Sequence, residues 1–244
     1  RLHLLIMTSN TYRMGKHWNP NAAAKDPDNN LLWRIPYRRL EVEAIRDSML
    51  AVSGQLNRKM FGPSTYPYLS EEATRGQSYP QKAWKPFDEE EASRRTIYAF
   101  VKRSLVVPLF EVLDFCDTAR SADRRDVTTV PTQALTLFNG NFVNRQAGHF
   151  ANRLMTEAGS EPNRQIELAY RLALSRPPTA VEHAEMRAFL EAETGNQIKR
   201  LAQQQGSAES DREAKAIDVK DARRLALAQM CRVLFNLNEF VYTD

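Results

Sequence analysis

Apolar residues recur three and four positions apart along almost the whole chain after residue 127. This spacing places them on one face of an α-helix, which has 3.6 residues per turn. Thr179 and Glu182 stand three residues apart, as in a capping box, and mark the start of one helix. Glycine, asparagine and proline divide the pattern into separate elements. The predicted elements are helices at about 141–159 and 162–174, a polar connection at 195–211 that is mobile at its centre, and a final helix at 213–236.

The first 127 residues carry a more mixed pattern. One helix is predicted over about 38–53, with Gly54 supplying its left-handed end. Prolines and aromatic rings are interleaved over 55–94, which indicates an ordered excursion rather than a free linker. Residues 95–103 are β-branched and aromatic in alternation, so we predict a strand there that pairs with residues 66–69. The remaining predictions are a short helix up to Asn10, a loop over 13–30 and a short helix over 109–115.

Together these patterns predict the fold class. We expect a mainly α-helical, bundle-like single domain over 1–244, with one small two-stranded β-hairpin and a proline- and aromatic-rich excursion. Its helix, loop and hairpin part covers 1–127 and its helical part 128–244. A chain of 244 residues can bury a sizeable core without disulfides or metals.

The composition excludes several classes of protein. Lys and Arg number 34 and Asp and Glu 30, so the net charge of +4 is small and both signs are interspersed, which argues against a nucleic-acid binder. No stretch approaches the ~18 apolar residues of a membrane-spanning helix. Cys116 and Cys231 form no metal or CxxC pattern, and two buried thiols are favoured over one disulfide. The four histidines lack metal-ligand spacing, and no nucleophile or phosphate-loop motif occurs. We therefore expect no catalytic residue, metal or cofactor in this segment.

Arginines and carboxylates supply the candidate site. An arginine-lined pocket could bind a carboxylate, a sulfate or a sugar acid, because a guanidinium matches planar oxyanions bidentately. The alternative is that these arginines pair with nearby Asp and Glu and hold the helices together. The acidic string over 114–126 is interpreted as ion pairs rather than as a calcium loop. The aromatic rings over 61–87 would either stack on sugars or seal the excursion onto the body. The candidate anion-binding residues are Arg38, Arg39, Arg95, Arg103, Arg124 and Arg125, and the candidate acid/base residues are Asp47 and Asp126.

Several blocks of the sequence resemble one family. These are the segments 28–34, 38–54, 95–103, 125–135 and 234–244, together with the opening residues 3–13. They resemble the bacterial PSD-one domain, unknown-function domain family 1553, which is typical of planctomycete-type exported proteins. The chain opens inside an apolar pattern without an initiator methionine, so we interpret it as a C-terminal fragment of a larger protein.

The resemblance implies a context rather than a mechanism. It implies an exported protein of the periplasm or cell envelope, with upstream companion domains as partners and a cytochrome c-like haem region elsewhere in the parent. Sulfatase-like proteins or glycans are further partners that it implies. We expect a non-catalytic structural or docking module; the alternative is binding or hydrolysis of acidic or sulfated glycans through the arginine-lined pocket.

Overall fold

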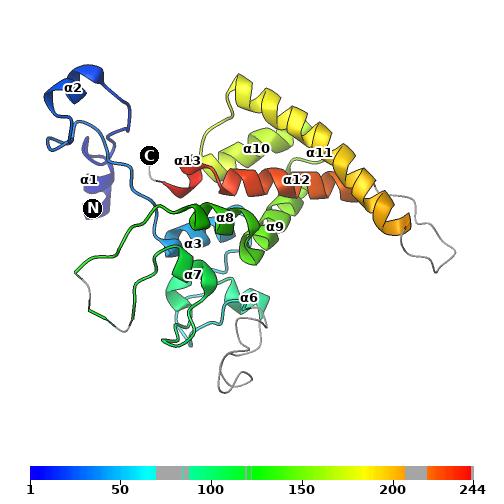
Figure 1. The fold of residues 1–244 in the computed structure, drawn as a ribbon, viewed down its shortest axis with the longest axis horizontal. Coiled ribbons are helices and arrows are strands. Elements are labelled where there is room, and N and C mark those ends of the chain that lie inside the picture. The colour runs from blue at the N-terminus through cyan, green and yellow to red at the C-terminus, as the bar shows by residue number, and fades with distance from the viewer. Residues whose placement is uncertain (70–83, 85–87, 119, 122, 207–218, 243–244) are drawn as a thin grey trace.

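The structure, a computed structural model, describes residues 1–69, 84, 88–118, 120–121, 123–206 and 219–242. The fold is mainly α-helical, as predicted (Figure 1). The elements are α1 (Leu2–Met7), α2 (Pro20–Lys25), α3 (Val42–Val52), α6 (Glu89–Ala92), the 3-10 turn η1 (Thr96–Tyr98), α7 (Pro108–Val112), α8 (Pro131–Asn139), α9 (Asn141–Glu157), α10 (Pro162–Leu174), α11 (Ala180–Gly206), α12 (Val219–Phe235) and α13 (Asn238–Val241).

The core forms around α12. This helix runs through the centre of Figure 1 and packs against α9 on one side and α11 on the other. Phe150 of α9 and Phe235 of α12 are fully buried and stack with their ring centroids 5.7 Å apart. Cys231 lies in the same core as a free thiol, and burial raises its pKa well above the usual value. Cys116 is also free but exposed. The prediction of two free thiols is therefore confirmed, but only Cys231 is buried and packs as a small hydrophobe.

The helix predicted at 38–53 is present as α3, which begins four residues later than predicted, at Val42, and its apolar stripe is buried against α7 and α9. Gly54 follows with φ of +78°, the left-handed conformation that a helix end favours. The helix at 162–174 is confirmed at the predicted residues. The connection predicted at 195–211 is helical as far as residue 206, because α11 continues into it, and the rest of that range lies outside the described residues. The side chain of Gln197 is buried there and donates to Glu193.

The predicted strand is absent from the described chain. Residues Thr96–Tyr98 form η1 instead, and residues 65–69 pair with this segment only through an isolated parallel bridge between Thr65 and Ala99, among the described residues. The predicted antiparallel hairpin with residues 66–69 is therefore wrong. The side chains of this segment do not alternate between two covered faces of a sheet. Thr96 is buried against α3, whereas Ile97 stays 77% exposed. The rest of the partner region, 70–83, lies outside the described residues.

Residues 1–37 form an N-terminal arm that lies beside the helical body (Figure 1). The loop predicted at 13–30 contains α2, because the Asn19 side chain accepts hydrogen bonds from the backbone N–H groups of Asn21 and Ala22 and Pro20 occupies the first turn. The rings of Trp18 and Trp33 meet edge to face at 5.5 Å. The arm is therefore ordered by contacts within itself.

Arg176 joins the C-terminal end of the chain to the start of α11. Its guanidinium donates to Glu182 at 2.7 Å and to Glu239 at 2.7 Å. The predicted capping box is confirmed, since Thr179 N–H donates to Glu182 and Glu182 N–H donates to the Thr179 hydroxyl. The hydrogen bonds from Arg176 lower the pKa of Glu182 from 4.5 to about 2. Glu182 therefore stays ionised in the folded protein under acidic conditions.

We predict an acid-dependent loss of stability at this junction. The pKa of Glu182 is lower in the folded state than in the unfolded state, so its contribution is present above about pH 4.5 and is lost as the pH falls towards 2. Urea unfolding of the wild type and of Glu182→Gln should differ most near pH 6 and converge near pH 2. A difference that stays constant from pH 6 to pH 2 would contradict this account.

Candidate functional site

The predicted arginines do not share one pocket. Arg39 is buried and donates to the carbonyl oxygen of Leu113 and to the carboxylate of Asp114. Asp114 has φ of +57° and also accepts from the backbone N–H of Thr128 at 2.7 Å and from Gln133. Burial would raise the pKa of Asp114, but the bonds from Thr128 and the charge of Arg39 lower it below its usual value. This group joins the start of α3 to the segment before α8.

Arg125 makes a second, separate ion pair. Its two terminal nitrogens donate to the two carboxylate oxygens of Glu43 at 2.7 Å each, and Glu41 lies 3.5 Å away. The hydrogen bonds with Glu43 raise the pKa of Arg125 above its usual value. Arg38 lies 3.9 Å from Glu41 at the surface. These carboxylates occupy the positions that an anionic ligand would take.

Asp47, a candidate acid/base residue, is held by three donors. Its carboxylate accepts from the backbone N–H and the hydroxyl of Thr96, both at 2.7 Å, and from Arg95 at 3.1 Å. Its oxygens therefore serve to fix η1 on α3. Arg103 and Arg124 are exposed, and neither takes part in an ion pair within the described chain.

Asp126 lies where the predicted residues come closest together. It lines a cavity of about 20 Å³ with Arg38, Arg39 and Arg125. A cavity needs a volume of about 10–15 Å³ to hold one water molecule, so a cavity of this size is too small for a sugar ring. The structure thus brings four of the eight candidates together around a space of the size of a water molecule, and Asp47 and Arg95 do not line that space.

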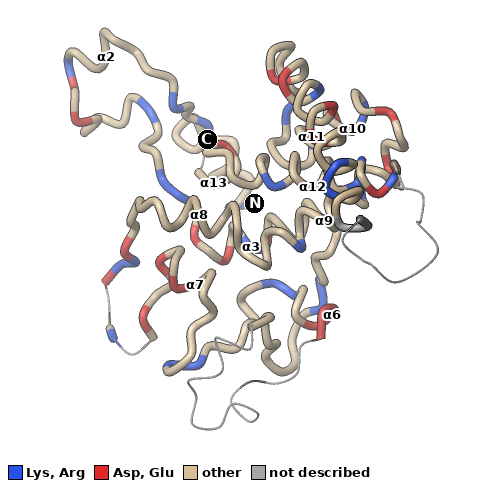
Figure 2. The backbone as a smooth tube through the Cα atoms, turned by 45° about the vertical axis from the view of Figure 1, so that its right-hand side comes forward, with Lys and Arg blue, Asp and Glu red and all other residues tan. Residues whose placement is uncertain are grey.

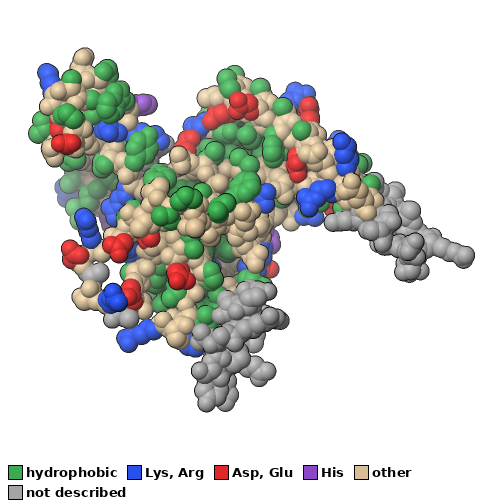
Figure 3. Space-filling model, viewed as in Figure 1, with side chains coloured by type: hydrophobic (Ala, Val, Ile, Leu, Met, Phe, Trp, Pro, Cys, Tyr) green, Lys and Arg blue, Asp and Glu red, His purple; other side chains and the backbone are tan. Residues whose placement is uncertain are grey.

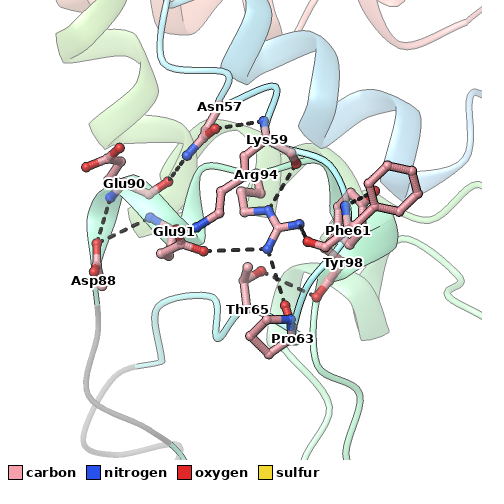
Figure 4. Close-up of polar contacts among 10 residues, drawn as sticks. All are labelled: Asn57, Lys59, Phe61, Pro63, Thr65, Asp88, Glu90, Glu91, Arg94 and Tyr98. Carbon is pink, nitrogen blue, oxygen red and sulfur yellow. Dashed lines mark hydrogen bonds and ion pairs between the residues drawn. The ribbon is translucent and has the colours of Figure 1, made fainter.

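Arg94 is a buried structural residue that is not among the candidate site residues predicted from the sequence. Its side chain is fully buried, and it donates to the carbonyl oxygens of Lys59, Phe61 and Pro63 (Figure 4). The guanidinium also lies 4.1 Å from the ring centroid of Tyr98. A single side chain therefore satisfies three carbonyls of an irregular segment and seats it against η1.

Arg46 does the same from α3. It is buried and donates to the carbonyl oxygens of Ala92 and Arg94 and to the Thr96 hydroxyl. Burial lowers its pKa to about 10, so it remains charged at neutral pH. The sequence signal for it was available, because Arg46 is four residues after Val42 and so falls on the apolar face of its helix.

Two clefts lie away from these ion pairs. A polar cleft of about 650 Å³ borders α9 and the turn after α3, and its lining includes Arg58, His149 and Arg153. His149 Nε2 lies 3.2 Å from Glu89, so this histidine joins α9 to α6. A second cleft, of about 620 Å³, is lined by α10, α11 and α12. The described residues contain no cluster of histidine, cysteine and carboxylate side chains that could hold a metal, and no helix among them is long and apolar enough to cross a membrane.

We predict that removing the guanidinium of Arg46 destabilises the protein strongly. Arg46→Met keeps an unbranched, mostly apolar side chain but leaves two buried carbonyls and the Thr96 hydroxyl without this donor, which should lower the free energy of unfolding by about 3 kcal/mol. The matched control, Arg171→Met, removes only an exposed pair with Glu167 and should cost about 0.5 kcal/mol or less. Urea denaturation at neutral pH measures both. Equal, small losses would show that the buried contacts of Arg46 are not needed.

A family profile described as PSD1, a protein of unknown function (DUF1553), matches residues 1–190. The resemblance noted above at residues 234–244 lies outside that match. No curated protein and no solved structure matches the chain. The profile covers more than half of the 244 residues, and the chain therefore belongs to the PSD1 (DUF1553) family.

Proposed function

We propose that this chain is a non-catalytic docking module, and that its N-terminal arm binds a companion domain of a larger exported protein. The observation that carries the proposal is α1. This helix has the sequence LHLLIM and none of its residues is buried. Its large apolar side chains are 47–68% exposed. A helix of six residues is not stable alone in water, so its apolar side chains need a surface to pack against.

The rest of the arm supports the same role. Trp18 is 62% exposed and Leu31 82% exposed, although the segment that carries them is ordered. Arg34 stacks over the rings of Trp18 and Trp33, with its guanidinium 5.1 Å from each centroid. Asp26 is buried and accepts from the backbone N–H groups of Asn30 and Leu31. The arm therefore presents aromatic and aliphatic side chains from a preformed backbone, and Figure 3 shows them at its surface.

The charge of the arm indicates the chemistry of its partner. Residues 1–37 contain five Lys and Arg and two Asp, a net charge of +3 (Figure 2). A partner surface with an apolar centre and a rim of Asp and Glu would match both features.

The glycan-binding alternative has less support. Arg39, Arg95 and Arg125 are each engaged by a carboxylate of this chain. An acidic glycan would have to displace those partners and would leave their charges unpaired. Export to the periplasm or cell envelope, and a haem-binding region elsewhere in the parent protein, rest on the family resemblance and form part of the proposal.

The test replaces two exposed leucines of α1. Leu4→Asp combined with Leu5→Asp should leave the melting temperature unchanged, because neither residue is buried. It should weaken binding of the separately produced companion domain by about a hundredfold or more, since each buried leucine contributes about 1.5–3 kcal/mol. Isothermal titration calorimetry measures the affinity.

The matched control is Val181→Asp. Val181 is 67% exposed on α11, and its replacement should leave the affinity unchanged. The proposal fails if the wild type does not bind the companion domain, or if the α1 variant binds it as tightly as the wild type does.

A further inference from the structure

We propose that the cleft between α10, α11 and α12 binds a single-chain amphiphilic carboxylate, of the fatty-acid class. This site is separate from the proposed docking arm, which lies at the other side of the molecule in Figure 1. The volume of the cleft, about 620 Å³, falls within the range of small-molecule pockets. Much of it also lies outside the segment that the family profile matches, because α12 begins at Val219.

The cleft has an apolar floor. Met155 comes from the end of α9, Leu190 from α11 and Leu227 from α12. Leu190 and Leu227 are almost fully buried, and Met155 is partly buried against the core. Gly159 and Ser160, in the turn before α10, carry too little side chain to fill the space above this floor. An alkyl chain placed there would cover carbon atoms that are otherwise in contact with water.

Positive charge surrounds this floor. Among the described residues that line the cleft, Arg187, Lys220 and Arg223 are cationic and Glu191 is the acidic one. Glu191 is engaged by Arg187, whose Nε lies 3.2 Å from its carboxylate. Arg223 is exposed and takes part in no ion pair within the described chain. Arg223 is therefore the cation of this lining that is placed to bind one carboxylate.

The apolar floor and the cations beside it together indicate which class of ligand the cleft binds. An apolar floor with cations beside it matches a molecule with an apolar chain and one anionic head, whereas a sugar or a nucleotide would cover the floor with polar groups. A cleft of about 620 Å³ is of the size that holds one small molecule, such as an alkyl chain with a carboxylate.

The experiment titrates the full chain with dodecanoate, dodecanol and dodecyltrimethylammonium below their micellar concentrations, by isothermal titration calorimetry. Dodecanoate should bind with one site per chain, dodecanol more weakly and the cation weakest of all. Arg223→Ser should weaken dodecanoate binding by about tenfold or more, because it removes a charge-assisted hydrogen bond. Arg224→Ser is the matched control: Arg224 is the next residue on α12, pairs with Asp221 and does not line the cleft.

Two further variants identify the place of binding. Thr194→Phe puts a ring into the cleft and should abolish binding, with circular dichroism confirming that the helices remain. The Leu4→Asp and Leu5→Asp variant should bind dodecanoate as the wild type does, whether or not the arm proves to be a docking element. The proposal is overturned if dodecanoate does not bind, if the three head groups bind equally, if Arg223→Ser and Arg224→Ser have equal effects, or if the arm variant loses binding.

Discussion

The buried guanidinium of Arg46 is the interaction on which the irregular half of the molecule depends. It lies on the core-facing side of α3 and holds the carbonyl oxygens of Ala92 and Arg94. A buried charge that loses its partners costs several kcal/mol, so the chain after α6 must keep these carbonyls turned towards α3. Asp47, the next residue, fixes η1 from the other side through Thr96. A helix and a segment without regular pairing are thereby joined by side chains rather than by a β-ladder.

Two further arginines also donate to backbone carbonyl oxygens. This use of arginine explains why an arginine-rich sequence need not contain an anion pocket. Arg94 satisfies three carbonyls around residues 59–63, and Arg39 satisfies Leu113 and Asp114. A guanidinium offers five donors in a fixed plane, which suits clusters of carbonyl oxygens that no strand or helix pairs. The bonded carbonyls belong to turns and loops or, for Ala92, to the last residue of the short helix α6. These arginines are thus part of the scaffold, and they are already occupied.

The helical part of the molecule is built differently, and its unsatisfied surfaces are apolar rather than charged. The helices α9, α11 and α12 bury one continuous core that includes Phe150 and Phe235. One of its apolar regions stays open, the cleft above Leu227, and in the N-terminal arm the apolar side chains of α1 are exposed as well. The arm carries a net charge of +3, which together with α1 suits a protein surface with acidic groups. The cleft is concave and of small-molecule size, which suits an alkyl chain with a carboxylate.

The sequence by itself determined the helical class and most of the later helices, because periodic apolar spacing and capping residues such as Thr179 and Glu182 act within a few residues of one another. It also pointed to ion pairing as one alternative for the arginines. Only the tertiary structure decided which partners they take, because Arg39 meets Asp114 and Arg125 meets Glu43 across more than 70 residues of chain. The prediction of a strand at 95–103 was wrong because it, too, depended on contacts between residues far apart in the sequence. Alternation describes two faces of a sheet, and whether a neighbouring strand exists is settled by contacts far away in the chain.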